Sequence, residues 1–237
     1  MLKGQVALVT GASRGLGKHC ALALAKAGCD VAILARDNNQ LAQTAGKINA
    51  LGQKCFFGPC DLTQPDSIKG FLKQSEQVLG PVDILINNAG IGSYKPFLEH
   101  SIEEVINISQ LNLTAMMLLS HWLLPNMIKN KRGSIINIGS DVSQKPLANM
   151  APYVASKFGV RGFTQSLLRE YKNQGIKIMQ LNPGIMDTHF NQGKEGSKEI
   201  NWALNAREVS ETIMWMLNQP HYQLIDEINI HALDQNF

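Results

Sequence analysis

Short apolar segments alternate with longer segments of helical period along the whole chain, and this alternation restricts the fold more than any other feature. The short segments are Val6–Thr10, Asp30–Ala35, Lys54–Gly58, Val82–Asn87, Ser134–Gly139, Lys177–Asn182 and Ile225–Ile230. The helical segments between them are Leu16–Ala27, Asn39–Leu51, Pro65–Val78, Ile102–Lys129, Tyr153–Asn173 and Ala206–Leu217. Apolar strands separated by helices belong to a parallel sheet that is covered on both faces. Because crossovers are right-handed, the sequence predicts a doubly wound α/β fold with a seven-stranded parallel sheet.

The bulk composition suits one large domain spanning residues 1–237. Hydrophobic residues make up 44% of the 237 and charged residues 17%, which is ordinary for a protein with a substantial core. The net charge of +3 is small, and no run of lysine and arginine is long enough to indicate a nucleic-acid partner. No stretch of about 18 apolar residues occurs, so we expect no membrane span and no membrane partner.

The cysteines and the start of the chain bear on the compartment. Cys20, Cys29, Cys55 and Cys60 show no C-x-x-C spacing and no metal-ligand pattern with the histidines, so we expect free thiols and no metal. Cys20 and Cys29 are interpreted as small buried side chains. A strand follows Met1 almost at once, so we expect no export signal. These features predict a cytoplasmic protein.

A glycine-rich turn joins the first strand to the first helix. Its residues are Thr10, Gly11, Ala12, Ser13, Arg14, Gly15, Leu16 and Gly17. Glycines allow a tight turn and let backbone N–H groups approach a pyrophosphate at the helix N-terminus. The spacing is G-x-x-x-G-x-G, and its place between a strand and a helix indicates a nucleotide site. We therefore expect a Rossmann-type, dinucleotide-binding domain.

The end of the second strand bears on which dinucleotide binds. An acidic side chain there binds the ribose 2′-hydroxyl of NAD, whereas an arginine accommodates the 2′-phosphate of NADP. Arg36 occupies this region, and Arg14 in the glycine turn can reach it. Asp37 argues for NAD unless it caps the helix that follows. Two arginines against one ambiguous aspartate favour NADP(H), with NAD(H) as the alternative.

Two further strand ends carry residues suited to a cofactor. Asp61, followed by Leu62, could accept a hydrogen bond from adenine or cap a turn. A run of small and amide residues after the fourth strand consists of Asn87, Asn88, Ala89 and Gly90. Such residues suit either close approach to a cofactor or a simple turn.

Tyr153 and Lys157 lie four residues apart on a predicted helix and therefore share one face. A free phenol has a pKa near 10, but a neighbouring ammonium favours its ionised form and lowers that pKa. Such a phenol can exchange a proton with a carbonyl or alcohol oxygen near pH 7. Ser140 adds a hydroxyl that could hold the same oxygen. Taken alone, the spacing also fits a half-buried ring beside a solvated amine.

Together these motifs resemble the short-chain dehydrogenase/reductase family, over essentially the whole chain. The matching positions are Thr10, Gly11, Gly15, Gly17, Asp61, Asn87, Asn88, Ala89, Gly90, Asn112, Ser140, Tyr153, Lys157, Pro183, Gly184 and Thr188. The chain is closest in style to NADPH-dependent members similar to 3-ketoacyl-(acyl-carrier-protein) reductases. It departs from them at its end, which lacks a Gly-rich closing segment.

The resemblance implies a catalytic role for four residues. Tyr153 would be the general acid in reduction and the general base in oxidation, and Lys157 would bind the nicotinamide ribose and lower the Tyr153 pKa. Ser140 would stabilise charge on the substrate oxygen. Asn112 would interrupt its long helix and hold a water that relays protons through Lys157. The implied cofactor contacts are Gly11, Ser13, Arg14, Gly15, Leu16, Gly17, Arg36, Asp61, Leu62, Asn88, Ala89, Gly90, Tyr153, Lys157, Pro183, Gly184 and Thr188.

We therefore predict an NADPH-dependent oxidoreductase that transfers a hydride between the nicotinamide and a small carbonyl or secondary-alcohol substrate. The alternatives are an NADP-binding sensor or scaffold without turnover and a methyltransferase, neither of which needs the Ser-Tyr-Lys set. Asp141 stands where small residues are common in the family and is interpreted as shaping the substrate pocket. The polar segment His189–Asn205 is either a substrate lid or a surface loop.

The helices that begin near Ile102 and Tyr153 are apolar around more than one face, and such helices need a second packing partner. In the family they usually form a subunit interface. We therefore expect a homodimer or homotetramer.

Overall fold

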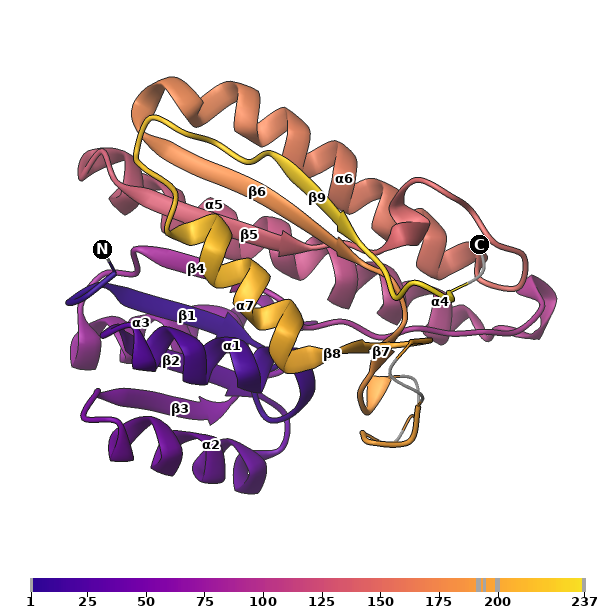
Figure 1. The fold of residues 1–237 in the computed structure, drawn as a ribbon, viewed down its shortest axis with the longest axis horizontal. Coiled ribbons are helices and arrows are strands. Elements are labelled where there is room, and N and C mark those ends of the chain that lie inside the picture. The colour runs from indigo at the N-terminus through magenta and orange to yellow at the C-terminus, as the bar shows by residue number, and fades with distance from the viewer. Residues whose placement is uncertain (1, 191–192, 194, 199–200, 236–237) are drawn as a thin grey trace.

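The central sheet has seven parallel strands (Figure 1) in a computed structural model that describes residues 2–190, 193, 195–198 and 201–235. The strands are β1 (Val6–Thr10), β2 (Asp30–Ala35), β3 (Cys55–Pro59), β4 (Ile84–Asn87), β5 (Gly133–Ile138), β6 (Ile176–Pro183) and β9 (Glu227–Ile230). Their order is β3-β2-β1-β4-β5-β6-β9. After β3 the chain crosses back to form β4 on the other side of β1, so the order in which strands are added reverses between β1 and β4. The predicted seven-stranded, doubly wound sheet is confirmed.

Helices cover both faces of this sheet. They are α1 (Gly15–Lys26), α2 (Asn38–Ala50), α3 (Pro65–Leu79), α4 (Ile102–Ser109), α5 (Ala115–Lys129), α6 (Ala151–Tyr171) and α7 (Ala206–Leu217), with short turns η1 (Phe97–Glu99), η2 (Gln110–Thr114), η3 (Asp141–Ser143) and η4 (Lys172–Gln174). The helices α1, α2 and α7 pack on one face, and α3, α5 and α6 pack on the other. Figure 1 shows α1 and α7 side by side, and they contact each other along their length.

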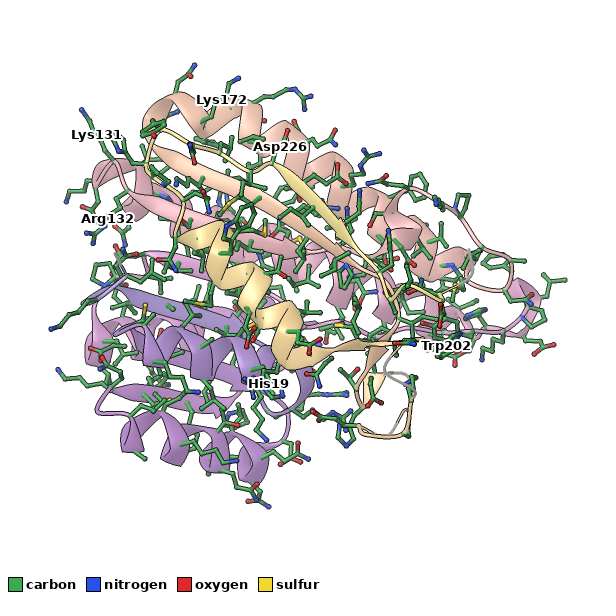
Figure 2. All side chains as sticks on the ribbon, in the orientation of Figure 1. His19, Lys131, Arg132, Lys172, Trp202 and Asp226 are labelled. Atoms are coloured by element: carbon green, nitrogen blue, oxygen red, sulfur yellow. The ribbon has the colours of Figure 1, made fainter. Side chains whose placement is uncertain are left out.

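Two apolar cores follow from the alternation of side chains along each strand. In β1, Ala7 and Val9 point into the core beneath α1, α2 and α7, whereas Val6 and Leu8 point into the opposite core. A strand that is buried on both faces must be apolar at every position, which explains its continuous apolar sequence. Charged side chains instead stand at the periphery, such as Lys131 before β5 and Lys172 after α6 (Figure 2).

Two local features depart from the predicted strand and helix ranges. The predicted helix Ile102–Lys129 is divided into α4 and α5 by the π-helical turn η2. A small unpredicted sheet pairs β7 (Met186–Asp187) with β8 (Leu204–Asn205). The predicted lid His189–Asn205 falls partly on residues 191–192, 194 and 199–200, which lie outside the described residues.

The cysteines agree with their interpretation as core residues. Cys20 and Cys29 are fully buried, and all four thiols are free. Among the described residues, no helix is long and apolar enough to cross a membrane. Within the same ranges, no three acidic, cysteine or histidine side chains form a group that could hold a metal ion.

Candidate active site

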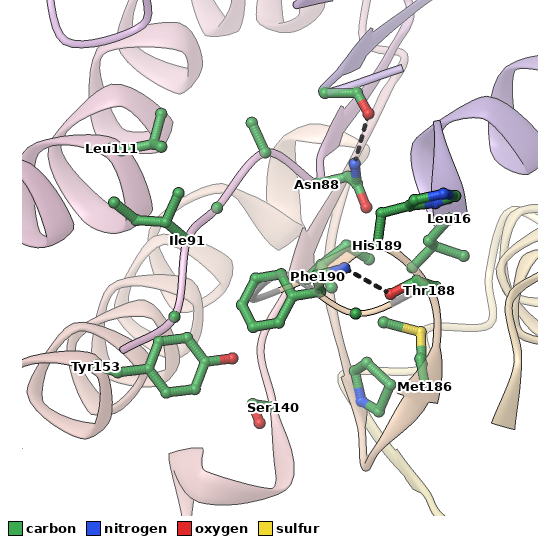
Figure 3. A pocket seen from close by; sticks show the side chains of 18 of the residues that line it. Leu16, Asn88, Ile91, Leu111, Ser140, Tyr153, Met186, Thr188, His189 and Phe190 are labelled. Carbon is green, nitrogen blue, oxygen red and sulfur yellow. Dashed lines mark hydrogen bonds between the residues drawn. The ribbon is translucent and has the colours of Figure 1, made fainter. Parts of the chain in front are cut away.

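A cavity of about 1130 Å³ opens where the strands β1, β2, β4, β5 and β6 end. This is the carboxyl edge of the sheet, where doubly wound folds bind ligands. Figure 3 shows residues from four separate parts of the chain facing it, namely Leu16, Asn88, Tyr153 and Thr188. Of the predicted site residues, only Gly17 and Asn112 do not line it. The cavity is large enough for a dinucleotide together with a small substrate.

The glycine turn needs its glycines for two different reasons. Gly11 and Gly15 have φ of +66° and +54°, a region that favours glycine. Gly17 lies against the back of the turn, where a Cβ would overlap the Gly11 carbonyl and come within 2.5 Å of the Asn88 side-chain amide. The turn is therefore narrow, with backbone exposed at the start of α1, and it fits a pyrophosphate bound against its N–H groups.

The turn after β4 is fastened to this glycine turn. The Thr10 hydroxyl accepts hydrogen bonds from the backbone N–H groups of Asn88 and Ala89, both at 2.9 Å. The Asn88 side chain donates to the Thr10 carbonyl at 2.8 Å. Asn88, Ala89 and Gly90 also line the cavity. The two interpretations of this run are thus compatible, because the residues form a structural turn and a cavity wall together.

Charged side chains line the far end of the cavity, where β2 and β3 end. Arg14 and Arg36 are exposed there. Asp37 caps α2 by accepting a hydrogen bond from the Gln40 N–H at 3.0 Å. The capping interpretation of Asp37 is therefore confirmed, and Asp37 also lines the cavity.

Asp61 forms the turn that was one of its two interpretations. Its Oδ1 accepts hydrogen bonds from the Thr63 N–H at 2.9 Å and the Thr63 hydroxyl at 2.8 Å. These bonds lower the pKa of the Asp61 carboxyl, with a smaller contribution from the positive charge of Arg36. Asp61 still lines the cavity beside Leu62.

At the opposite end of the cavity, β5 and α6 bring together the residues of the proton-transfer set. Ser140 follows β5, and Tyr153 and Lys157 stand on the first turns of α6. Tyr153, Ser140 and Lys157 are all buried, at 6%, 8% and 5% exposure. The Lys157 ammonium donates to the Ile138 carbonyl at 2.8 Å and lies 5.7 Å from the centre of the Tyr153 ring.

The pKa of Tyr153 is raised, which is opposite to the direction expected from its spacing with Lys157. Burial is the largest cause, and the neighbouring Tyr94 and Asp141 add to it, whereas a hydrogen bond with Ser140 lowers the pKa. Burial also lowers the pKa of Lys157 to about 8, so the ammonium stays mostly charged at neutral pH. The raised pKa keeps the Tyr153 phenol protonated.

Asn112 lies behind the cavity wall, in the π turn that interrupts its helix. Its Oδ1 accepts from the Ile91 N–H at 2.9 Å, and its amide donates to the Ile91 carbonyl at 2.9 Å and to the Ser156 hydroxyl at 3.1 Å. The interruption of the helix that the resemblance implied is present. The Asn112 side chain thus ties the wall after β4 to helix α6.

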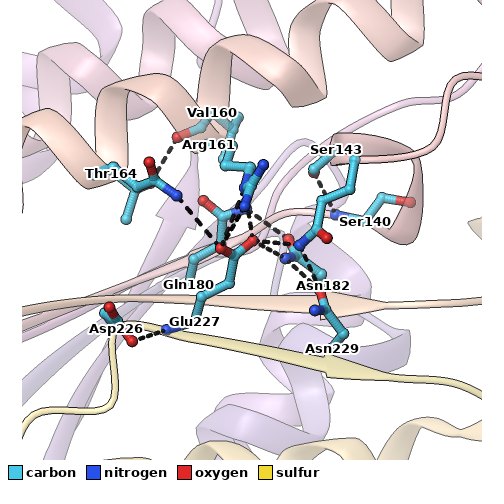
Figure 4. A network of polar contacts seen from close by, with 12 residues as sticks. Ser140, Ser143, Val160, Arg161, Thr164, Gln180, Asn182, Asp226, Glu227 and Asn229 are labelled. Carbon is cyan, nitrogen blue, oxygen red and sulfur yellow. Dashed lines mark hydrogen bonds and ion pairs between the residues drawn. The ribbon is translucent and has the colours of Figure 1, made fainter.

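A polar network supports the loop that carries Ser140 (Figure 4). The Ser140 N–H donates to the Ser143 hydroxyl at 3.1 Å. Next to this loop, the Glu227 carboxylate of β9 accepts hydrogen bonds from Arg161 at 3.0 Å, Gln144 at 2.7 Å and Asn182 at 2.6 Å. The network thus joins α6, β6 and β9 beside the loop that carries Ser140.

Glu227 gives this network a pH dependence. Burial acts to raise its pKa, but the hydrogen bonds from Arg161, Gln144 and Asn182 outweigh burial, and the pKa is lowered. A lowered pKa contributes stability above the unfolded pKa of about 4.3, and that stability is lost as the pH falls through the folded pKa.

We expect Glu227→Gln to lower the free energy of unfolding at pH 7 by about 1–3 kcal/mol, because it removes charge-assisted hydrogen bonds. The difference from the parent should shrink below about pH 4, where the parent carboxylate becomes protonated. Urea unfolding at both pH values measures this. Glu211→Gln breaks an exposed pair with Arg207 at 3.3 Å and should cost less than about 0.5 kcal/mol. A loss at Glu227 no larger than this control would contradict the role of the network.

The sequence analysis did not identify Gln235 as part of the cavity end that contains Ser140 and Tyr153. Gln235, in the C-terminal segment, donates to Asp141 Oδ2 at 2.6 Å and accepts from the Ile185 N–H at 2.7 Å. Ser140 donates its hydroxyl to Asp141 Oδ1 at 2.8 Å. Nothing in the sequence pattern indicated Gln235, because the contact joins residues 94 positions apart. The only signal was the unusual Asp141.

The segment after β6 lines one side of the cavity. Thr188 is 4% exposed and would lie 3.6 Å from a Cβ at Gly15. The Phe190 ring packs 5.9 Å from the Tyr153 ring, centre to centre. His189 lines the cavity and lies 3.6 Å from a Glu195 carboxylate oxygen. The described part of the segment therefore covers both the glycine turn and Tyr153.

The comparisons with known proteins agree on one family. The sequence profile described as short chain dehydrogenase matches residues 5–199. The chain is 38% identical over 185 residues to the ketoacyl reductase HetN of Nostoc sp. (strain PCC 7120), covering 78% of this chain and 64% of HetN. It is 38% identical over 187 residues to the 3-oxoacyl-[acyl-carrier-protein] reductase FabG of Vibrio cholerae, covering 79% and 75%.

A solved structure has the same fold as this chain. The alcohol dehydrogenase of the archaeon Thermococcus sibiricus, solved with 5-hydroxy-NADP, superposes with a TM-score of 0.92 at 28% identity and covers 98% of each chain. The sequence and fold matches extend over the glycine turn, the sheet and the tyrosine helix together. The chain therefore belongs to the short chain dehydrogenase family, oxidoreductases that act on CH–OH or C=O groups with NAD(P).

Proposed function

We propose that this protein is an NADPH-dependent carbonyl reductase in which Tyr153 is the general acid. The observation that carries the proposal is that Tyr153, Ser140 and Lys157 line one end of a cavity whose other end is the glycine turn. Figure 3 shows Tyr153 and Ser140 facing the same space. A binding protein without turnover has no need for a buried proton donor at this place.

The protein's own groups act on the substrate oxygen. The bound nicotinamide would supply a hydride to the carbonyl carbon, and the oxygen would take the Tyr153 proton to give the alcohol. Burial keeps that proton on the phenol at neutral pH, so the phenol is present as an acid when a carbonyl substrate binds. The Ser140 hydroxyl would hold the oxygen on which negative charge develops.

Lys157 and Asn112 would restore the Tyr153 proton. The Lys157 ammonium lies behind the phenol and close to Gly90, where a Cβ would be 4.0 Å from its nitrogen. From there Lys157 would bind the nicotinamide ribose. The Asn112 side chain accepts from the Ile91 N–H and donates to the Ile91 carbonyl. These two bonds would fix the π turn in place, and the turn would keep a path for water to Lys157 open.

The cofactor choice rests on the arginines at the far end of the cavity. Arg14 and Arg36 flank the place where a 2′-phosphate would lie, and guanidinium groups suit phosphate oxygens. The structurally similar Thermococcus sibiricus enzyme was solved with an NADP derivative. We propose NADP(H) as the cofactor, with adenine beside Asp61.

Arg36→Ala should weaken NADPH binding by about tenfold or more, because it removes a charge-assisted contact. NADH binding should change by less than about threefold, because NADH has no 2′-phosphate. Fluorescence titration with both cofactors measures this. Arg169→Ala removes an exposed guanidinium of α6 outside the cavity and should change neither. Equal losses for both cofactors at Arg36 would contradict a phosphate contact.

The central test is turnover. NADPH oxidation is followed with a panel of ketones and aldehydes, and NADP⁺ reduction is followed with the corresponding alcohols. We expect turnover of at least one pair. A protein that binds NADPH tightly but consumes it with no carbonyl compound would instead be the sensor or scaffold of the alternative interpretation.

We also propose that the segment after β6 is a substrate lid.

We further propose that the chain forms a homodimer or homotetramer. Apolar side chains stand exposed on α4 and α6, among them Ile102 at 75% and Phe158 at 42%. Such side chains on adjacent helices suit a subunit interface. Light scattering of the purified protein measures the assembly.

A further inference from the structure

A carboxylate stands beside the reacting oxygen. Asp141 lines the cavity and accepts the Ser140 hydroxyl proton at 2.8 Å. Ser140 is the residue that would hold the substrate oxygen, and its single hydroxyl proton would turn from Asp141 to that oxygen when substrate binds. The substrate oxygen would then lie within about 6 Å of the carboxylate, the sum of two hydrogen-bond lengths. An ammonium on the carbon next to the reacting carbon would come within reach of Asp141.

The donors that hold the Asp141 carboxylate are neutral. Oδ1 accepts from the Ser140 hydroxyl and from the Val142 N–H, both at 2.8 Å, and Oδ2 accepts from the Gln235 amide at 2.6 Å. None of the ion pairs between described residues includes Asp141. An ionised carboxylate has about four acceptor positions, so Oδ2 retains capacity for one more donor. The site thus offers a fixed negative charge to a ligand.

Gln235 fixes the direction of this charge. Its side chain is 7% exposed and is itself held by the Ile185 N–H at 2.7 Å. Asp141 cannot turn away from the cavity without breaking the three part-buried hydrogen bonds that Ser140, Val142 and Gln235 donate to it. The negative potential extends to both neighbouring phenols, because Asp141 contributes to raising the pKa of Tyr94 and of Tyr153.

Aromatic rings complete this side of the cavity. The Tyr153 ring lies 6.4 Å from the Tyr94 ring and 5.9 Å from the Phe190 ring. Figure 3 shows Phe190 and Tyr153 on facing sides of the space above Ser140. Aromatic faces attract cations, and three rings with one carboxylate form a surface suited to an amine.

We propose that Asp141 selects substrates with a cationic amine next to the reacting carbon, so that this protein interconverts amino ketones and amino alcohols. This inference rests on the proposed reductase function and names its substrate class. An anionic substrate would be repelled by the same carboxylate.

The test compares three alcohols of similar size in NADP⁺ reduction: isopropanolamine, which is cationic, sec-butanol, which is neutral, and lactate, which is anionic. The parent should show a kcat/KM for isopropanolamine at least about tenfold above that for sec-butanol, a difference of about 1.4 kcal/mol, with lactate lowest. Asp141→Asn should remove this preference, so that in this variant kcat/KM for isopropanolamine falls to within about threefold of that for sec-butanol, because the negative charge beside Ser140 is gone.

Two further variants test whether the preference for the amine comes from the negative charge of Asp141 or from its hydrogen bonds. Asp66→Asn removes an exposed carboxylate of α3 outside the cavity and should leave the preference intact. Asp141→Asn combined with Gln235→Glu keeps a hydrogen bond between the two residues but moves the charge away from Ser140. This double variant should also lose the preference for the amine, whereas a merely structural role of Asp141 predicts that it behaves as the parent.

The outcomes distinguish this inference from the proposed function. Equal loss for all three alcohols in Asp141→Asn, or no preference for the amine in the parent, overturns the inference and leaves the reductase intact. If none of the alcohols is oxidised, calorimetry with isopropanolamine decides. Binding by the parent that Asp141→Asn abolishes supports the amine site, and the absence of binding overturns it.

Discussion

Tyr153→Phe should lower kcat for carbonyl reduction by about 100- to 10,000-fold, the contribution of a positioned general acid. The substitution removes only the hydroxyl and keeps the ring, which packs against Tyr94 and Phe190. The cavity should therefore keep its shape, and the Kd for NADPH should stay within about threefold, because the ring still fills its site. Steady-state kinetics and NADPH titration measure the two quantities separately.

A matched control comes from the same helix. Tyr171→Phe removes a phenol at the other end of α6, away from the cavity, and should leave kcat within about twofold, because it touches neither substrate nor cofactor. If Tyr153→Phe turned over as fast as the parent, the proton would come from another group and the proposed mechanism would be wrong.

Gly17→Ala should weaken NADPH binding by about tenfold or more and lower the free energy of unfolding by about 1–3 kcal/mol, as expected for overpacking. The added methyl group would overlap the Gly11 carbonyl and approach the Asn88 amide nitrogen to 2.5 Å. Neither the turn nor Asn88 can move freely, because Asn88 is bonded to Thr10. The glycine turn would therefore deform, although residue 17 does not line the cavity.

Gly70→Ala is the matched control for this substitution. A Cβ at Gly70, in the middle of α3, has no atom within 4 Å, so the change should raise stability by about 0.5–1 kcal/mol. Thermal unfolding and NADPH titration of both variants give the comparison. Unchanged NADPH affinity in Gly17→Ala would show that the back of the turn does not control the cofactor site.

The chemistry at the cofactor end could be predicted because it depends on local sequence. The glycine spacing between a strand and a helix requires only neighbouring residues, and so does the cap that Asp37 provides for α2. Tyr153 and Lys157 share a helix face for the same reason. Position at the carboxyl ends of parallel strands then brought these residues to one edge of the sheet.

The direction of the Tyr153 pKa shift could not be predicted in the same way. The spacing of Tyr153 and Lys157 predicted a lowered phenol pKa, but burial raises it. Desolvation depends on which segments cover the phenol, and these include Phe190, which is distant in the sequence. The Lys157 ammonium donates to the Ile138 carbonyl. The four-residue spacing by itself gives no information on the burial of the phenol or on the hydrogen-bond partner of Lys157.

The sequence by itself determined the order of strands and helices, the glycine turn and the spacing that places Tyr153 and Lys157 on one helix face, because each depends on periodicity or short spacing. Only the tertiary structure decided what surrounds these two side chains. Gln235 reaches Asp141 across 94 positions, and Glu227 reaches Gln144 across 83. Such contacts arise from packing, which fixes long-range pairs that no local pattern encodes. The family follows from the sequence, whereas the side chains that surround Asp141 and Tyr153 follow from the fold.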